Sequence, residues 1–320
     1  MITPQQRSPS EYGHVAVCAG GRSAERAVSL RSGAAVLAGL QARQISAELV
    51  DLDTDFCRRA TAGEFDRVFI SVHGQGGEDG ALQGFLDLLQ LPYSGSNQPA
   101  SVLGMNKQLT KLIWHEAGLA TPAWRPVNDL SALKTAAAEL GLPLMVKPVS
   151  EGSSVGISLV DEQSQLERAW LLAESTDQAV IAEQFIVGQE YTVALVQGQP
   201  LPTIRITTPH RFYDYEAKYI SDQTGYHCPS GLTEKAENNL ADIAAEAFSA
   251  IGGTGWGRID FMVDDQDKPW LVEANTVPGL TDHSLVPMAA KAFGWDFSDL
   301  VEQILRSSFI QETGKGQANG

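Results

Sequence analysis

Near the C-terminal end of the chain, residues suited to metal chemistry recur at alternate positions. Arg258 and Asp260 lie in one alternating run and Glu273 and Asn275 in a second, with a short polar turn between the runs. The pattern predicts a β-hairpin over residues 256–275. If the turn is centred between positions 266 and 267, Asp260 lies opposite Glu273 and Arg258 lies opposite Asn275. Opposed residues share a face of a sheet, so we expect these four side chains on one surface.

The predicted pairing of two carboxylates requires an explanation, because like charges directly opposite each other destabilise a sheet. A divalent cation such as Mg²⁺ would remove this penalty, since it binds oxygen ligands and keeps positions for phosphate. The alternative is an exposed polar face on a surface hairpin. The same alternation predicts that Leu271 shares the face of Glu273, opposite Val272 and Ala274.

A lysine and a glycine-rich loop form a second group of candidates. Lys147 ends an apolar strand predicted over residues 144–148, and residues 151–156 follow with glycines and serines. Small residues free backbone N–H groups to bind anionic oxygens, so the loop is a candidate phosphate cradle beside a basic side chain. It does not match the P-loop pattern. The alternatives are an ordinary hairpin turn and a strand-end lysine whose ammonium group reaches water.

Four further candidates each keep two interpretations, and a fifth, Glu25, has one. Glu183 and Glu190 are strand acids that either face a ligand or lie at a strand edge. His73, in a loop of glycines, is either catalytic or a structural hydrogen-bonding residue. Glu25 is most simply an acid in the first turn of a helix. The aromatic and charged segment 212–219 is either a solvated loop or a lid that excludes water from a site.

The elements that position these residues alternate between strand and helix over residues 14–106. This order predicts an α/β domain with a mainly parallel sheet, whose ligand loops follow the carboxyl ends of strands. A small α+β unit is expected over residues 107–187, where Ser131 is a plausible N-cap of a helix over residues 131–140. A C-terminal unit over residues 188–310 contains the hairpin.

Three segments show no regular pattern. Residues 1–13 and 311–320 are polar, and we expect a disordered lead-in and tail. Residues 207–231 form a long segment without periodicity, which in a compact domain indicates a functional or mobile loop.

Composition limits the class of protein. The chain has 320 residues, of which 43% are hydrophobic and 19% charged, as in a soluble globular protein. The net charge of −16 argues against a nucleic-acid surface and requires any polyphosphate site to be locally basic. No apolar run reaches the roughly 18 residues of a membrane helix. The three distant cysteines and the lack of a signal peptide indicate a reducing, cytoplasmic location.

Taken together, the motifs resemble the D-alanine–D-alanine ligases of the ATP-grasp superfamily. They occur in the family's order over nearly the whole chain. The matching residues are 20–26 with 28–30, 73–74 with 76–80, 146–148 with 151–156, 213–219, 257–260, 273–276 with 278–279, and 283–287. The resemblance implies a three-domain ATP-grasp architecture, with a lid over residues 207–231.

The resemblance also implies roles toward ATP and metal. The residues that would contact phosphate are Lys107, Lys147 and Lys218, while Glu190 would hold the ribose. Glu183 and the backbone that follows it, at Gln184, Phe185 and Ile186, would contact the adenine. The ligands of two Mg²⁺ ions, which Mn²⁺ can replace, would be Asp260, Glu273 and Asn275. Gln184 departs from the family, since many members have lysine there, and we expect at most a modest effect on nucleotide affinity.

For the substrates, Glu25 would bind the amino group of the first D-alanine, and His73 would also contact a substrate. Arg258 and the Gly279 backbone would stabilise the tetrahedral intermediate. Ser284 and Leu285 would hold the carboxylate of the second D-alanine. A hydrogen-bonded triad would tie the lid to the N-terminal domain; its members are Glu25, Ser153 and Tyr219.

The implied reaction supplies peptidoglycan precursors. ATP phosphorylates the first D-alanine to D-alanyl phosphate, which the amine of the second D-alanine attacks. Tyr219 favours the dipeptide product over a depsipeptide, and the resemblance implies a homodimer formed through the N-terminal domain. Two alternatives remain open. Another carboxylate–amine ligase would differ in its second substrate, and a regulatory nucleotide-binding protein would lack one of the metal or phosphate residues.

Overall fold

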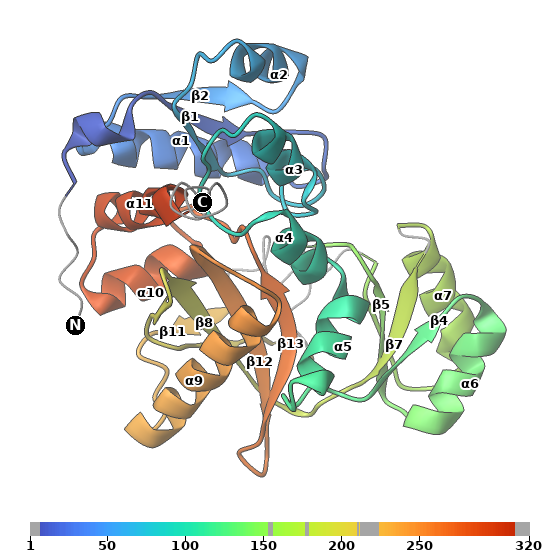
Figure 1. Ribbon diagram of the computed structural model, residues 1–320. Coiled ribbons are helices and arrows are strands. Elements are labelled where there is room, and N and C mark those ends of the chain that lie inside the picture. The colour runs from blue at the N-terminus through green and yellow to red at the C-terminus, as the bar shows by residue number, and fades with distance from the viewer. Residues whose placement is uncertain (1–6, 153–155, 177–178, 210, 212–223, 311–320) are drawn as a thin grey trace.

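The computed structural model describes residues 7–152, 156–176, 179–209, 211 and 224–310. These residues form three sheets, and helices cover or connect them (Figure 1). The first sheet lies at the top of Figure 1, the second at the right, and the third in the lower centre. Ser153, Lys218, Tyr219 and most of the predicted lid lie outside the described residues.

The N-terminal sheet is parallel, as the sequence predicts, with strand order β2-β1-β3. Its strands are β1 (Val15–Ala19), β2 (Ala47–Asp51) and β3 (Arg67–Ile70), and its helices are α1 (Arg26–Ala42), α2 (Thr54–Thr61) and α3 (Ala81–Leu88). The sequence did not reveal α2, because this short helix buries only Phe56 and Ala60 and is otherwise charged or polar. Asp53 caps it by accepting hydrogen bonds from the N–H groups of Asp55 and Phe56.

The start of the chain is more ordered than the sequence suggests. A disordered lead-in is expected over residues 1–13, yet Pro9–Tyr12 form a short 3-10 helix. Tyr12 is fully buried, and its carbonyl accepts a hydrogen bond from Arg67 Nε at 2.7 Å. Its ring also contacts Phe309. The prediction of disorder fails because the buried ring of Tyr12 holds this otherwise polar segment in place. Residues 1–6 and 311–320 lie outside the described part of the chain.

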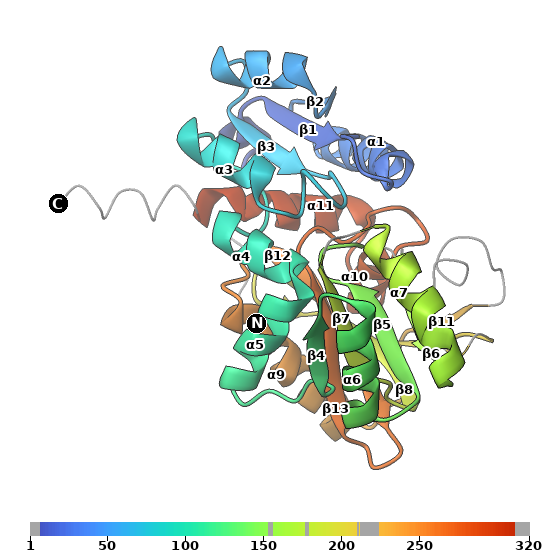
Figure 2. The ribbon, with the colours of Figure 1, turned by 90° about the vertical axis from the view of Figure 1, so that its right-hand side faces the viewer.

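The second sheet is antiparallel, with strand order β4-β7-β5-β6. Its strands are β4 (Trp124–Val127), β5 (Leu144–Pro148), β6 (Ser158–Val160) and β7 (Val180–Gln184), and its helices are α6 (Leu130–Leu140) and α7 (Leu166–Glu174). Figure 2 shows both helices beside this sheet. Leu144 and Val146 of β5 face the helices, so Met145 and Lys147 face the opposite side.

The predicted cap of α6 is wrong. Asp129, not Ser131, is the N-cap residue, and its carboxylate accepts a hydrogen bond from Ala132 N at 2.7 Å. Both residue types cap helices well. The predicted helix begins too late. The helix starts at Leu130, so the cap is the residue before it, Asp129, and the serine already lies within the helix.

The third sheet has strand order β11-β10-β8-β12-β13, and β9 pairs with β8. Its strands are β8 (Gly188–Val196), β9 (Gln199–Pro200), β10 (Ile204–Thr207), β11 (Gly225–His227), β12 (Trp256–Asp264) and β13 (Pro269–Asn275). Helix α9 (Glu234–Ala250) covers one face. The other helices are α4 (Gln98–Met105), α5 (Lys107–Glu116), α10 (Leu285–Phe293) and α11 (Phe297–Arg306).

The β12–β13 hairpin has the predicted pairing at the end that carries its charged residues. Asp260 lies opposite Glu273, and Arg258 lies opposite Asn275. The register then shifts, because Phe261 pairs with Leu271 and leaves Val272 as an extra residue, a β-bulge.

The bulge corrects one prediction about this hairpin. Leu271 does not share the face of Glu273, because it is buried in the core beside α9. Strict alternation fails at Val272, so both Val272 and Glu273 line the same pocket.

The cores join segments that the predicted boundaries separate. Trp114 of α5 is buried in the core under α9, and its indole N–H donates to Ala247 O at 2.9 Å. Helix α11 packs against α1, so the first core includes side chains from both ends of the chain. The domain boundaries at 106 and 187 stay predictions.

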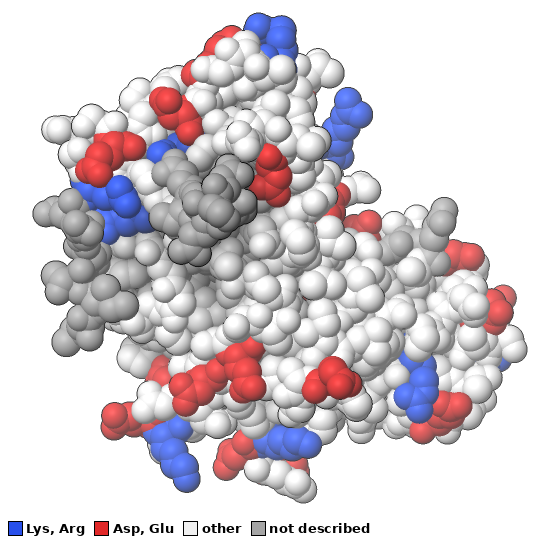
Figure 3. All heavy atoms as spheres, in the orientation of Figure 1, with Lys and Arg blue, Asp and Glu red and all other residues white. Residues whose placement is uncertain are grey.

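Charged side chains of both signs are interspersed over the face of the molecule shown in Figure 3. In the part of the chain that the structure describes, no helix is both long enough and apolar enough to cross a membrane.

Candidate active site

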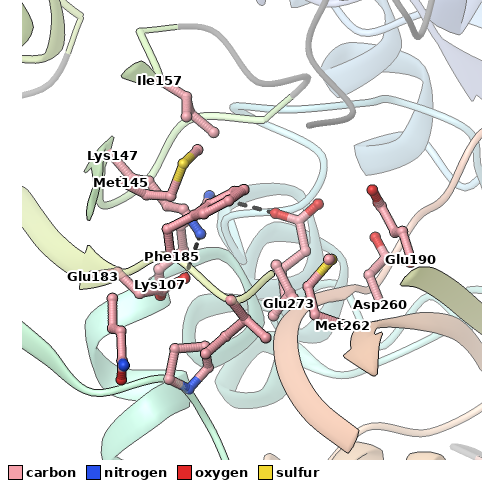
Figure 4. Close-up of a pocket in the computed structure, with 14 residues that line it drawn as sticks. Lys107, Met145, Lys147, Ile157, Glu183, Phe185, Glu190, Asp260, Met262 and Glu273 are labelled. Atoms are coloured by element: carbon pink, nitrogen blue, oxygen red, sulfur yellow. Dashed lines mark hydrogen bonds and ion pairs between the residues drawn. The ribbon is translucent and has the colours of Figure 1, made fainter. Parts of the chain in front are cut away.

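The main pocket lies between the second and third sheets. It is an open cleft with an empty volume of about 690 Å³, which includes space open to solvent. Side chains from both sheets and from the start of α5 converge on it (Figure 4). The residues that line it are Lys107, Pro122, Met145, Lys147, Ile157, Glu183, Gln184, Phe185, Ile186, Glu190, Asp260, Met262, Val272 and Glu273.

One wall carries a buried basic cluster. Lys147 lies diagonally across β5 and β7 from Glu183, and its Nζ donates to Glu183 Oε1 at 2.6 Å. Lys111 of α5 approaches the other oxygen, Oε2, at 2.6 Å. Burial would raise the pKa of the Glu183 carboxyl, but the two lysines outweigh this effect and hold it below its ordinary value. Lys147 is therefore a paired lysine that faces the cleft, not one that reaches water at a strand end.

Lys107 brings a further positive charge to the cleft from the first turn of α5. Asn106 caps this helix through its side chain, which accepts a hydrogen bond from Leu109 N at 3.0 Å. The Lys107 ammonium group donates to Glu151 O at 2.6 Å and lies 3.9 Å from Glu273 Oε2. It therefore connects the glycine-rich loop to the acidic hairpin.

The opposite wall carries the acids of the hairpin. Asp260 is buried, and its carboxylate accepts two hydrogen bonds from Arg258, both at 2.8 Å. Thr192 Oγ1 donates to Oδ1 at 2.6 Å, and Asn275 Nδ2 donates to Oδ2 at 3.1 Å. Glu190, on β8 opposite Met262, also lines the cleft. Arg258 is thus the counter-ion of Asp260.

The donors on this wall fit a hard divalent cation. Asp260 and Glu273 are directly opposed carboxylates, and Asn275 adds an amide next to them. Among the described residues, no group of three or more His, Cys, Asp and Glu side chains is placed to hold a metal ion. A cation here would therefore need Asn275 and the oxygens of a bound phosphate to complete its ligands.

A smaller pocket, with an empty volume of about 380 Å³, shares Lys107, Val272 and Glu273 with the main one. Glu78 also lines it, although only 16% of this side chain is exposed. Burial and then the nearby charge of Glu25 raise the pKa of Glu78 to about 8. The sequence placed Glu78 in a motif and gave it no role.

Glu25 lies at the junction of two loops. A Cβ atom added to Gly74 would come within 2.6 Å of Glu25 Oε2, and one added to Gly152 within 3.0 Å. The carboxylate therefore approaches both backbones closely, which explains why small residues stand at these positions. Glu25 thus lies beside the second pocket, which Gly152 lines.

His73 is structural in this geometry. It is buried, its Nδ1 donates to Val277 O at 2.9 Å, and its Nε2 accepts from the Ser32 hydroxyl at 2.9 Å. Burial lowers the pKa of the imidazole and favours the neutral ring. His73 therefore joins the loop after β3 to α1 and to the loop before α10. Its predicted place in a substrate subsite stays a prediction.

The predicted carboxylate site lies at the start of α10. Ser284 is the N-cap residue, but its hydroxyl forms hydrogen bonds with Thr281. The Ser284 side chain therefore accepts no hydrogen bond from the backbone N–H groups of the first turn. Gly279 adjoins the same hydroxyl, because an added Cβ would come within 2.8 Å of it. The backbone N–H groups in the first turn of a helix, which here begins at Leu285, suit an anion.

Most of the predicted nucleotide and metal residues thus meet in one cleft. The members that line it are Lys107, Lys147, Glu183, Gln184, Phe185, Ile186, Glu190, Asp260 and Glu273. Sequence reasoning missed the contributions of Lys111, Thr192 and Glu78. A lysine one turn after Lys107 was a signal for the first, because residues four apart share a helix face.

Comparison with known proteins agrees with this geometry. Residues 113–306 match the family described as D-ala D-ala ligase C-terminus, and residues 53–96 match D-ala D-ala ligase N-terminus. The D-alanine–D-alanine ligase of Ectopseudomonas mendocina is 50% identical over 94% of this chain and 96% of its own length.

Solved structures show the same fold. The D-alanine–D-alanine ligase of Bacillus anthracis superposes with a TM-score of 0.84 at 32% identity, covering 94% of this chain and 99% of its own. A second structure of that enzyme is complexed with ATP. The VanG D-Ala:D-Ser ligase of Enterococcus faecalis has a TM-score of 0.81 at 27% identity, covering 92% of this chain and 99% of its own.

The three sheets and the cleft between the second and third define an ATP-grasp enzyme, the fold that the sequence predicts. Within that class, the chain belongs to the D-alanine–D-alanine ligase family. The family and the ligase class predicted from the sequence are confirmed.

Proposed function

We propose that this protein uses ATP to join two D-alanine molecules into D-alanyl-D-alanine for peptidoglycan synthesis. The observation that carries the proposal is the cleft, in which buried Lys107 and Lys147 face Asp260 and Glu273. An acidic protein needs such a local basic wall to hold a polyphosphate. Family membership supports the same reaction.

The nucleotide would lie along the cleft between the sheets. Phe185, Ile186 and Met262 supply apolar surface for the adenine, beside the carboxylate of Glu183. Glu190 would hold the ribose. Lys107 and Lys147 would contact the phosphates, and Lys218 would join them from the lid. The modest effect expected of Gln184 is consistent with its exposed side chain.

Asp260, Glu273 and Asn275 would hold two Mg²⁺ ions, or Mn²⁺ in their place. When bound, these ions would supply positive charge to the phosphoryl group as it transfers. Arg258 would then share its guanidinium between Asp260 and the reacting acyl group, to which the Gly279 backbone would also donate. The residues of this chain would thus act mainly by positioning and charge.

Both amino acids would bind beyond the phosphate end of the cleft. Glu25 would bind the ammonium group of the first D-alanine, with Ser153 and Tyr219 in its hydrogen-bonded triad. Phosphorylation converts the first carboxylate into an acyl phosphate, and the second amine attacks its carbonyl carbon and expels phosphate. Ser284 and Leu285 would orient this second D-alanine through its carboxylate. The lid would exclude water, which otherwise hydrolyses the acyl phosphate.

The proposal predicts D-alanine-dependent phosphate release when the protein is incubated with ATP, Mg²⁺ and D-alanine, with the dipeptide as product. Competition with D-serine and D-lactate would measure the preference for the second substrate, because a relative of the same fold is named a D-Ala:D-Ser ligase. Absence of phosphate release by folded protein would contradict the proposal and favour a regulatory nucleotide-binding protein.

Glu273→Gln tests the acidic wall. The substitution keeps the size of the side chain and removes one of two opposed carboxylates, so the fold should remain intact. Ligase activity should fall by at least about 100-fold, the scale of losing an electrostatic contributor in a catalytic site. Asp265→Asn, in the exposed turn of the same hairpin, is the matched control and should keep full activity. Retained activity in Glu273→Gln would contradict the metal assignment.

We also propose a cytoplasmic homodimer. Use of ATP agrees with a cytoplasmic location, and the resemblance to the family suggests association through the N-terminal domain.

A further inference from the structure

Lys111 is a buried charge that the proposed reaction does not use. It lies one helical turn after Lys107, is only 1% exposed, and does not line the main pocket. Its ammonium group lies 2.6 Å from Glu183 Oε2 and donates to Thr121 Oγ1 at 2.7 Å. Buried lysines are rare unless paired, so this one needs a reason.

Glu183 has one lysine on each side. Lys147 binds its Oε1 from the cleft, whereas Lys111 binds its Oε2 from behind. The two lysines differ in what else they can reach. Lys147 lines the cleft and can turn to a bound anion, but Lys111 is enclosed by protein.

The position of Lys111 is fixed from a second direction. Thr121 Oγ1, which accepts its hydrogen bond, donates to Leu271 O at 3.0 Å. Leu271 comes directly before the bulge residue Val272, and Glu273 comes directly after it. Lys111 therefore joins the adenine end of the cleft to the strand that carries the acidic wall.

The buried Glu183 carboxylate needs a counter-ion at all times, which explains why two lysines surround it. A buried carboxylate without a counter-ion is strongly unfavourable. If Lys147 turned toward phosphate in a site without Lys111, Glu183 would lose its only close cation among the described residues. Burial lowers the pKa of Lys111 to about 8, an effect that the charge of Glu183 opposes and that of Lys147 reinforces. Each charge in the cluster thus depends on the others.

We propose that Lys111 is a positioning residue for the nucleotide: it holds the Glu183 carboxylate from behind, so that Lys147 is released to bind ATP. This inference rests on the proposed function. Lys111 touches neither nucleotide nor D-alanine, and acts only through Glu183 and Lys147.

Lys111→Met tests the proposal, since methionine keeps much of the stem and removes the charge. Isothermal titration with ADP and MgCl₂ should show a dissociation constant raised at least about tenfold, because Lys147 stays on Glu183. In the ligase assay, KM for ATP should rise while KM for D-alanine stays within about twofold. Lys134→Met, at an exposed lysine of α6, is the matched control and should bind ADP as the wild type does.

The double variant Lys111→Met/Glu183→Gln separates positioning from a structural role. With a neutral amide in place of the carboxylate at position 183, Lys147 no longer has a negative charge to neutralise. ADP binding should therefore recover relative to Lys111→Met alone, and the two losses should not add. Additive losses, or unchanged binding by Lys111→Met, would overturn the inference.

Folding is followed by circular dichroism for every variant. If Lys111→Met does not fold, the double variant, which leaves no unpaired carboxylate at this position, still supplies the test: it should fold and bind ADP, and its failure to fold would overturn the inference. Wild-type protein that binds no ADP would instead overturn the proposed function. The two failures are thus distinguishable.

Discussion

At the scale of single residues, the acidic wall is set by hydrogen bonds to one carboxylate. Asp260 is held by Arg258, Asn275 and Thr192, and Thr192 lies directly opposite it on β8. The Thr192 hydroxyl fixes Oδ1 at 2.6 Å and contributes no charge. It should therefore orient a metal ligand without being one, as partners of ligands do in metal sites.

Thr192→Val tests this role, because valine keeps the shape and strand preference of threonine and removes the hydroxyl. The Mg²⁺ concentration that gives half-maximal ligase activity should rise by about tenfold, the lower end of the effect of losing such a partner. Thr192→Ser keeps the hydroxyl and should need close to the wild-type concentration. Equal Mg²⁺ requirements in all three proteins would show that Thr192 has no such role.

What the sequence reveals about single residues depends on how local the signal is. The pairing of Asp260 with Glu273 is predictable, because both lie in one hairpin whose alternation is regular on that side of the bulge. The contact of Lys111 with Glu183 is not predictable, since it joins helix α5 to strand β7, which lies far along the chain. No periodicity encodes such a pair, and the same holds for Thr192.

At the scale of elements, alternation explains how β8 serves two cores and the site. Tyr191, Val193 and Leu195 face α9, whereas Ala194 and Val196 face the core shared with the N-terminal sheet. Thr192 lies on the second face, next to Asp260. One strand therefore links hydrophobic burial to the position of a functional carboxylate.

The bulge in β13 shows where element prediction fails. Leu271 turns into the core, and its N–H donates to Ala120 O at 2.8 Å. A bulge changes which face later residues occupy, and its position depends on tertiary contacts that sequence alternation does not contain.

An ion pair joins helix α2 to the edge of the N-terminal sheet, and its contribution to stability should depend on pH. Arg59 donates to both oxygens of Glu48, at 2.6 and 3.0 Å, and His14 lies 2.8 Å from the same carboxylate. Arg59 first, and then His14, lower the pKa of Glu48 from 4.5 to about 2. A carboxyl with a lowered folded pKa stabilises the protein above pH 4.5 and loses that contribution as pH falls toward 2.

Glu48→Gln should reduce the free energy of unfolding by about 1 kcal/mol at pH 7, a value discounted for the solvent exposure of this pair. The difference from wild type should shrink as pH falls below 4.5, because the wild-type carboxyl then takes up protons. Urea unfolding at pH 7, 5 and 3.5 measures it. Glu116→Gln, at an exposed acid of α5, should differ little from wild type throughout. A difference that grows in acid would contradict the assigned pKa.

At the scale of the whole molecule, the site depends on the docking of three sheets. The first core combines side chains of the N-terminal sheet with those of α10 and α11, so the two ends of the chain fold against each other. The sequence predicted the parallel N-terminal sheet, the pairing at one end of the β12–β13 hairpin and most of the charged residues of the cleft, because motifs and alternation are local. It did not predict the shared core, which depends on how the sheets dock.

The proposed homodimer is tested at the same scale. Leu88 of α3 is 85% exposed, more than any other large hydrophobic residue that the structure describes, and it belongs to the N-terminal α/β part of the chain. Light scattering after size exclusion should give twice the chain mass of 34.4 kDa. Leu88→Asp should shift the mass toward one chain, since burying an unpaired carboxylate in an interface is unfavourable.

Leu171→Asp provides the matched control for this prediction. Leu171 is 58% exposed but lies on α7, beside the second sheet. The same charge placed there should leave the dimer intact. If wild-type protein has the mass of one chain, the homodimer is excluded; if Leu171→Asp also dissociates it, the interface is not confined to the N-terminal domain. A dimer that survives Leu88→Asp would place the contact on another face of that domain.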